Sequence, residues 1–385
     1  PFDHAMERYL RATGRGPVRE GALAAADLLV ADAETADRPE DFYDQIVEMD
    51  LSSLEPYIVG PHSPDLARPI SELAKEAADK DYPEQISTAL IGSCTNSSYQ
   101  DISQAADIAR QATAKGMSMK SDLLVTPGSD TIHATVKRDG QLRDLQAAGA
   151  RLLANACGPC IGQWQRRDLE AGRRDVIVTS FNRNFRGRND GNPETLAFIA
   201  SPQIVTALGL AGSLAFNPLT DTLESEGKKL KLEPPAMAAE VPALGFAAAT
   251  GGYVAAAVDS DAVKVVVRPE SERLALLEAF APPDAEDFER MALLVITEGK
   301  TTTDHISPAG PWLRFRGHLD RISDNMFLGA LARGSRKRGT TRDPLTGESS
   351  KPIAAVARGL KAAQRRWVVV GDENYGEGSS REHAA

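Results

Sequence analysis

The sequence has few cysteines, no long apolar run and a deficit of positive charge. Three cysteines in 385 residues are too few for a disulfide framework. No uninterrupted apolar stretch is long enough to span a bilayer, so we expect neither a membrane-spanning segment nor a membrane partner. Lys and Arg number 44 against 54 Asp and Glu, which gives a net charge of −10 and argues against a nucleic-acid partner.

The remaining composition is that of an ordinary soluble globular protein, with 42% hydrophobic and 25% charged residues. A length of 385 residues predicts two to three domains with large cores. Residues 1–55 have mostly helical patterns, and residues 56–68 contain three prolines that are typical of a linker. Residues 225–285 are predicted to be a long interdomain connection with a strand at 263–268.

Between these connections, short apolar runs alternate with helical patterns. We expect strands at 88–91, 122–125, 152–153 and 175–178, and helices at 101–114, 194–200 and 204–210. A further unit contains expected strands at 292–296 and 367–370. This alternation predicts a multi-domain α/β fold in which ligand-binding groups gather at the carboxyl ends of the strands.

The three cysteines each follow an expected strand. Cys94 comes after one apolar run, and Cys157 and Cys160 come after another, in a C-G-P-C turn that lets two thiolates reach one centre. An iron–sulfur cluster would use all three thiolates and leave one iron open to a ligand. A zinc or redox site at Cys157 and Cys160 remains an alternative, as do buried, inert thiols.

Two polar loops also follow expected strands. Residues 182–190 contain three arginines within six positions, whose guanidinium forks suit a polycarboxylate, although a solvated surface loop has the same pattern. Residues 371–381 end in Ser379, Ser380 and Arg381. A serine there could act as an alkoxide base if backbone amides and Arg381 stabilise the oxyanion, or it could simply cap a helix.

Several of these segments together resemble the aconitase family. The matching motifs occur in the family's order along nearly the whole chain. They are residues 91–97 (I-G-S-C-T-N-S), 154–164 (A-N-A-C-G-P-C-I-G-Q-W), 182–190 (N-R-N-F-R-G-R-N-D), 302–307 (T-T-D-H-I-S), 315–318 (F-R-G-H) and 371–385. The second and third motifs are more similar to the mitochondrial type of aconitase than to the iron-regulatory type, so we expect no RNA binding.

The resemblance implies a chemistry and a set of site residues. It implies a [4Fe–4S] cluster held by Cys94, Cys157 and Cys160, whose fourth iron is a Lewis acid in the conversion of citrate to isocitrate through cis-aconitate. The substrate would be a small tricarboxylic acid. The other implied residues are Asn182 near the cluster, Arg183, Arg188, Arg316 and Arg381 as carboxylate clamps with Ser380 beside them, Ser379 as the base that takes the α-proton, and Asp304 and Ser307 as supporting catalytic residues.

The resemblance also implies a domain organisation. Residues 1–55 would be the remnant of an N-terminal α/β domain and 56–248 a three-layer α/β cluster-binding domain. Residues 249–273 would be a linker, and 274–385 the truncated start of a C-terminal α/β swivelling domain. On this basis we expect the 385 residues alone to be inactive, because the family's upstream part carries the histidine and acidic residues that complete its site. One of them is the acid that handles the leaving hydroxyl, and none of the six histidines here matches that acid. The full-length protein is expected to be a monomer.

Compartment and substrate are also expectations. The high Ala and Arg content of the sequence suggests a bacterial cytoplasm, whereas a lost transit peptide would place the same chain in the mitochondrial matrix. Related hydro-lyases acting on 2-methylcitrate, homoaconitate or isopropylmalate are alternatives to an aconitate hydratase.

Overall fold

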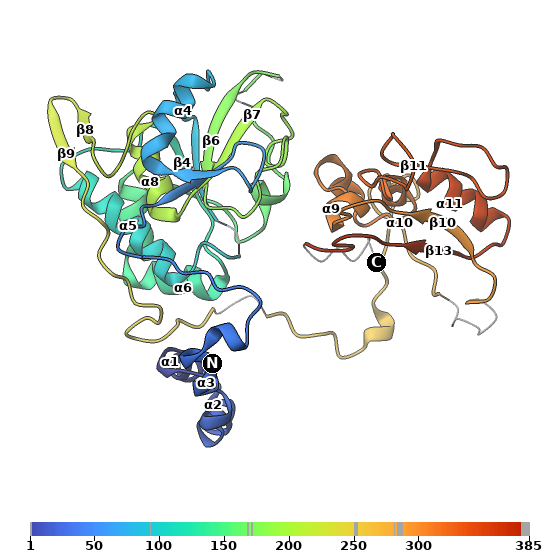
Figure 1. The fold of residues 1–385 in the computed structure, drawn as a ribbon, viewed down its shortest axis with the longest axis horizontal. Coiled ribbons are helices and arrows are strands. Elements are labelled where there is room, and N and C mark those ends of the chain that lie inside the picture. Colours follow the sequence, from blue (N-terminus) through green and yellow to red (C-terminus); the bar gives the residue numbers. More distant parts are fainter. Residues whose placement is uncertain are drawn as a thin grey trace. The chain divides into compact units, whose positions relative to one another are not determined.

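The computed structural model describes residues 2–92, 94–167, 169–170, 172–249, 253–280, 282 and 288–378. The chain divides into two compact units, one made of residues 1–160 and 164–254 and the other of 161–163 and 255–385 (Figure 1). Each unit has its own hydrophobic core. No helix among the described residues is long and apolar enough to cross a membrane.

The N-terminal part is helical, as the sequence predicts, up to residue 41. It contains α1 (His4–Ala12), α2 (Gly16–Ala24), α3 (Ala33–Asp37) and the short 3-10 helices η1 (Ala26–Leu28) and η2 (Pro39–Asp41). The side chain of Asp3 caps α1 by accepting a hydrogen bond from the Met6 amide at 2.8 Å.

The predicted linker at 56–68 is wrong. These residues form β1 (Tyr57–Val59) and most of β2 (Ala67–Pro69), an antiparallel pair at the edge of the sheet. Two of the three prolines lie in the connection between the strands, where no ladder hydrogen bond is required. After them come η3 (Ile70–Glu72) and α4 (Leu73–Asp79).

The large sheet has seven strands in the order β2-β1-β7-β6-β3-β4-β5. Five of them are mutually parallel, which confirms the predicted α/β class: β3 (Thr88–Ile91), β4 (Asp122–Val125), β5 (Arg151–Leu152), β6 (Asp175–Thr179) and β7 (Thr195–Ile199). The expected helix at 194–200 is therefore wrong. A short apolar run that is buried on both faces of a sheet cannot be distinguished from a buried helix by periodicity.

The two faces of this sheet are covered differently. Strand residues alternate between two buried clusters: Ala89 and Ile91 pack with the helices, whereas Leu90 belongs to the cluster on the opposite face with Phe181 and Trp164. The helices of the first cluster are α5 (Tyr99–Thr113), α6 (Asp130–Asp139), α7 (Gln141–Ala147) and α8 (Pro202–Ala211), together with α4. Among these, α5 packs against both α7 and α8.

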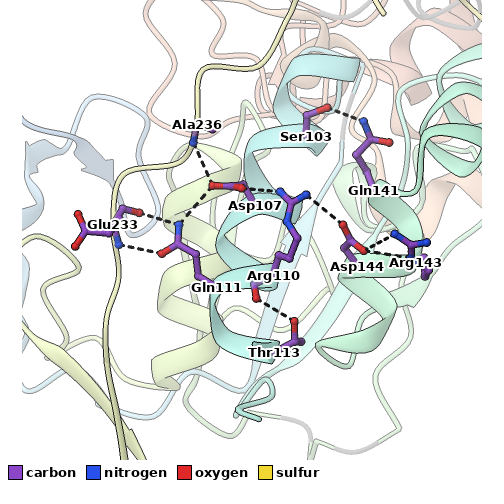
Figure 2. A network of polar contacts seen from close by, with 10 residues as sticks. All are labelled: Ser103, Asp107, Arg110, Gln111, Thr113, Gln141, Arg143, Asp144, Glu233 and Ala236. Carbon is purple, nitrogen blue, oxygen red and sulfur yellow. Dashed lines mark hydrogen bonds and ion pairs between the residues drawn. The ribbon is translucent and has the colours of Figure 1, made fainter. Parts of the chain in front are cut away.

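Residues 233–247, which follow the hairpin of β8 (Thr222–Ser225) and β9 (Lys228–Lys231), are held against the helices of the first unit. Gln111 of α5 exchanges two hydrogen bonds with the backbone of Glu233, at 2.9 and 3.1 Å, and Asp107 accepts one from the Ala236 amide at 3.1 Å. Figure 2 shows these side chains pointing from α5 toward the passing chain. The first part of the predicted interdomain connection is therefore fixed to the first unit.

The expected strand at 263–268 is also wrong, since these described residues form no strand. Val263, Val265 and Val266 are 62–89% exposed. Valines favour strands only where a partner edge and a packing surface are available.

The second unit is built around β10 (Ala292–Ile296) and β13 (Trp367–Val370), which pair in parallel. Both strands were expected from the sequence and are confirmed. The other described elements are η5 (Ser260–Ala262), α9 (Thr303–Ile306), η7 (Gly310–Phe315), α10 (Leu319–Ile322), η8 (Ser323–Asn325), β11 (Thr340–Thr341), β12 (Lys351–Pro352) and α11 (Ile353–Ala362). The core of the unit contains Leu294, Val295, Ile306, Val356 and Leu360.

Candidate functional site

The strand order of the large sheet creates a place where loops diverge. The chain proceeds from β3 to β4 and β5 on one side and then returns to β6 on the other side of β3. The carboxyl ends of β3 and β6 therefore flank a topological switch point, where α/β sheets bind ligands. Cys94 lies three residues after β3 and Asn182 three residues after β6, so both lie at this edge.

The two other cysteines lie in a tight turn after β5. The Cys160 amide donates a hydrogen bond to the Cys157 carbonyl oxygen at 2.9 Å. Gly158 has a φ of 38°, a backbone conformation that residues with a side chain rarely adopt. Cys157 and Cys94 are exposed, whereas Cys160 is partly buried. Because β3, β4 and β5 are parallel neighbours, both cysteine segments start from the same edge of the sheet.

The Cys160 thiol is affected by groups of both the cysteine and the arginine segments. Burial raises the pKa of the Cys160 thiol. The Arg188 guanidinium lowers that pKa, the thiols of Cys157 and Cys94 raise it, and Arg183 lowers it least. The structure thus brings together three cysteines and two of the predicted carboxylate clamps, all within the first unit.

The arginine loop is also tied directly to the cysteine turn. Arg188 Nε donates to the Cys160 carbonyl oxygen at 3.0 Å, and Asn189 Nδ2 donates to the Pro159 carbonyl oxygen at 3.1 Å. Asn189 is buried, with 2% of its surface exposed. Sequence reasoning missed Asn189 as a positioning residue, although it lies within the 182–190 motif.

The other members of this loop have distinct environments. Asn184 is fully buried and its Nδ2 donates to the Ala197 carbonyl oxygen at 3.1 Å, which anchors the loop to β7. Arg186 lies 3.7 Å from Glu194 in an exposed ion pair. Asn182 is exposed at the start of the loop. Of the three arginines, Arg183 and Arg188 are those whose charges lower the pKa of the Cys160 thiol.

Three thiols are donors of the kind that an iron–sulfur cluster uses. Among the described residues, no group of three or more His, Cys, Asp or Glu side chains converges closely enough for one ion. The thiols of Cys94 and Cys157 are nevertheless near enough to affect the pKa of Cys160. A cluster takes each thiolate on a different iron, so its cysteine sulfurs stand farther apart than those around one zinc ion.

The second unit contains another group of predicted residues. Asp304 lies in α9, whose N-terminus is capped by Thr302 and His305. Ser307 ends α9, is 1% exposed and lies with its hydroxyl 3.3 Å from Asn325 Oδ1. Arg316 follows η7 and is exposed.

The loop after β13 is joined to the segment that carries Asp304 and Ser307. The Thr301 amide donates to the Glu373 carbonyl at 3.0 Å, and the Thr303 amide donates to the Glu377 carbonyl at 2.9 Å. In the opposite direction, the Gly376 amide donates to the Thr301 carbonyl at 2.9 Å. This pairing follows from the parallel register of β10 and β13, whose carboxyl ends lie at one edge. Ser379, Ser380 and Arg381 follow this loop but lie outside the described residues.

The chain is similar in sequence to known proteins. A model described as the Aconitase family (aconitate hydratase) matches residues 1–212, and one described as the Aconitase C-terminal domain matches residues 291–385. The chain is 49% identical to a probable mitochondrial aconitate hydratase of Dictyostelium discoideum and 49% identical to the mitochondrial aconitate hydratase of Saccharomyces cerevisiae. It is 50% identical to that of Aspergillus fumigatus.

These alignments cover 100% of this chain and 49%, 49% and 48% of the respective relatives, so the chain spans about half their length. The relatives are named as mitochondrial, which contradicts the expectation of a bacterial cytoplasmic protein. That expectation rested on Ala and Arg content, which reflects composition rather than compartment. Because the family model covers more than half of the sequence, the chain belongs to the aconitase family, whose members use a [4Fe–4S] cluster.

Proposed function

We propose that this protein is an aconitate hydratase, which interconverts citrate and isocitrate through cis-aconitate. One observation supports this proposal most strongly: Cys94, Cys157 and Cys160 approach one another beside Arg183 and Arg188 at the switch point of the sheet. A site with three thiolates and two guanidinium groups suits a cluster and a substrate with several carboxylates.

In this proposal the three cysteines hold a [4Fe–4S] cluster, and Asn182 lies beside it. When bound, the cluster supplies a Lewis-acidic iron to the reaction. The thiol pKa of Cys160 is raised mainly by burial, so the neutral thiol is favoured until ligation displaces its proton.

Arginines bind the substrate carboxylates. The proposed carboxylate clamps are Arg183, Arg188, Arg316 and Arg381, and Ser380 precedes Arg381 in the sequence. The bond from Arg188 to the Cys160 carbonyl orients its guanidinium relative to the cysteine turn. Guanidinium forks bind carboxylates in bidentate geometry, which fixes the orientation of the substrate as well as its position.

Ser379 takes the α-proton in the proposed reaction. A serine is a weak base unless its oxyanion is stabilised, and Arg381 is proposed to supply the necessary positive charge. Asp304 and Ser307 support the base and the clamp. The hydrogen bonds between residues 301–303 and 373–377 hold the segment that precedes Ser379 against the one that carries these two residues.

We further propose domain limits of 1–55, 56–248, 249–273 and 274–385, and a monomeric protein without a nucleic-acid partner. The hydrogen bonds that attach residues 233–247 to the first unit support a limit close to 248. Light scattering of the purified protein and limited proteolysis around residue 250 test these statements.

The decisive experiment measures cluster assembly and turnover separately. The 385-residue chain is reconstituted without oxygen from ferrous iron and sulfide, and iron, sulfide, zinc and visible absorption are measured. We expect about four irons and four sulfides per chain, and loss of the cluster in Cys94→Ser, Cys157→Ser and Cys160→Ser. Bound zinc without sulfide would contradict the cluster and favour a zinc module.

Turnover is measured on the product of the complete reading frame that encodes this chain. Citrate, isocitrate, 2-methylcitrate, homoaconitate and isopropylmalate are compared, and the appearance of aconitate is followed by absorbance. Preference for citrate and isocitrate is expected. A cluster-loaded protein that prefers another of these acids would instead be a related hydro-lyase. The variant Arg183→Lys tests the carboxylate clamp, because lysine keeps the positive charge but loses the bidentate fork.

A further inference from the structure

Ser180 occupies a central position at the switch point. It is the first residue after β6, and none of its surface is exposed. Its hydroxyl oxygen accepts a hydrogen bond from the Gly92 amide at 3.0 Å. The same hydroxyl lies 3.1 Å from the carbonyl oxygens of Gly92 and Asn96, to either of which it can donate its one proton.

A second bond runs between the same two segments in the other direction. The Asn96 side-chain amide donates to the Ser180 carbonyl oxygen at 2.8 Å. Gly92 lies two positions before Cys94, and Asn96 lies two positions after it. Ser180 is therefore hydrogen-bonded to the chain on both sides of Cys94, although it is 86 positions away from Cys94 in the sequence.

The residue after Ser180 extends this connection to the other cysteines. Phe181 is buried in the cluster that includes Cys160 and Trp164. A Cβ built on Gly92 would lie only 3.2 Å from the Phe181 ring, so the chain before Cys94 packs closely on the same side chain. Two consecutive residues thus contact both cysteine segments.

We propose that Ser180 is a positioning residue that sets the place of Cys94 relative to Cys157 and Cys160 before a cluster binds. The inference rests on the proposed function, in which these cysteines hold a [4Fe–4S] cluster. A ligand loop that is already ordered loses less freedom when it binds, and partners behind a metal ligand commonly change metal affinity 10- to 100-fold. Alanine would remove both the acceptor for the buried Gly92 amide and the donor to the two carbonyls.

Ser180→Ala is compared with wild type and with a matched control, Ser121→Ala. Ser121 is also buried, and its hydroxyl donates to the Ile86 carbonyl oxygen at 2.7 Å, at the amino end of β4 and so at the opposite edge of the same sheet. Both variants lose a buried hydroxyl of the same sheet. A merely structural role of Ser180 would therefore give the same result for both.

The first measurement uses the metal-free chain. Amide hydrogen exchange at Gly92 and the rate at which dibromobimane links Cys94 to Cys157 or Cys160 are determined by mass spectrometry. We expect Ser180→Ala to increase the exchange rate at Gly92 at least tenfold and to slow the cross-link several-fold. Ser121→Ala is expected to change neither. Equal exchange and cross-linking rates in the two variants would overturn the inference, whether or not a cluster can be assembled.

The second measurement uses the reconstituted chain. The loss of visible absorption in excess chelator is expected to be roughly 10- to 100-fold faster in Ser180→Ala than in wild type or Ser121→Ala. Equal rates of loss in the two variants would also overturn the inference. A wild-type chain that assembles no cluster refutes the proposed function instead, while the metal-free measurement still decides whether Ser180 positions Cys94.

If Ser180→Ala does not fold, Asn96→Ala replaces it. This variant removes the 2.8 Å bond to the Ser180 carbonyl and leaves the Ser180 hydroxyl bonds to Gly92 in place. We expect smaller changes in the same direction, with cross-linking slowed and cluster loss accelerated relative to Ser121→Ala. Asn96→Ala rates that equal those of the control would overturn the inference.

Discussion

The buried ion pair of Arg166 and Asp175 allows a sharp test of what holds the first unit together. Their side chains are only 5% and 12% exposed. The Ser87 hydroxyl donates to Asp175 Oδ2 at 2.7 Å, and the Arg166 guanidinium carbon lies 5.1 Å from the centre of the Trp164 ring. Because Trp164 packs in the same cluster as Cys160, this pair fixes the chain that leaves the cysteine turn.

The perturbation is Asp175→Asn, which keeps the shape of the side chain and removes its charge. Arg166 cannot lose its proton, so its buried positive charge would lose the negative charge of Asp175. Breaking a buried pair in this way lowers the free energy of unfolding by about 3–5 kcal/mol. The amide oxygen of the new asparagine still accepts a hydrogen bond, so we expect a loss at the lower end, about 3 kcal/mol. At about 1.36 kcal/mol per factor of ten, that raises the opening equilibrium constant of the unit roughly 150-fold.

Amide exchange of Val176, Ile177 and Val178 measures this change in the first unit alone. These residues lie in β6, a central strand, and are fully buried. Their amides exchange when the unit opens, so their rates should rise by about the same factor as the opening constant. The matched double variant Arg166→Met with Asp175→Leu removes both charges and should recover most of the loss.

Two results would refute this reasoning. An increase in exchange of less than about tenfold in Asp175→Asn would mean that solvent or other groups already neutralise Arg166. A double variant as unstable as the single one would mean that the cost comes from packing rather than from the lost attraction between the two charges.

Three further predictions concern other parts of the chain. Gln111→Ala should speed amide exchange at Glu233 about 5- to 10-fold, since a net hydrogen bond is worth roughly 1 kcal/mol. Phe198→Ala should lower the unfolding free energy of the first unit by about 3–5 kcal/mol in urea, whereas Phe185→Ala, at a 43% exposed site, should cost little. His305→Gln should remove part of the pH dependence of the second unit, measured as thermal unfolding between about pH 7.5 and about pH 5.5.

The sign of the last effect follows from the environment of His305. Burial lowers its pKa below the ordinary 6.5, Arg338 and Lys300 lower it further, and Asp304 opposes them. The unfolded chain then binds more protons than the folded one as pH falls below about 6.5, so stability decreases with falling pH until the folded pKa is passed. In addition, His305 Nδ1 accepts a hydrogen bond from the Thr302 amide at 3.0 Å, which protonation would abolish.

Each of these predictions has a contrary outcome. Unchanged exchange at Glu233 would show that residues 233–236 are held by other contacts than Gln111. A Phe198→Ala protein as stable as Phe185→Ala would contradict the burial of β7. An unfolding temperature of His305→Gln with the same pH dependence as wild type would show that His305 has a similar pKa in the folded and unfolded states.

The sequence alone identified the strands and helices whose signals are local. The runs at 88–91, 122–125, 292–296 and 367–370 are apolar and short, and each is a strand in the structure. Residues 101–114 contain a helical pattern, and Ser98 with Asp101 forms the capping box that starts α5. The same local reasoning failed at 194–200 and 56–68, where burial on both faces and pairing at a sheet edge decided the outcome.

The chemistry of the site was also readable in the sequence, because thiols and guanidinium groups are specified by residue type. Their convergence was not, because Cys94 and Cys160 are 66 positions apart and approach only through the parallel order of β3, β4 and β5. The contacts of Ser180, Asn189 and Arg166 likewise depend on which loops the sheet places side by side. Residue type thus determined which chemical groups the candidate site contains, and only the tertiary structure decided which side chains hold those groups in place, since such contacts join segments with no local signal for one another.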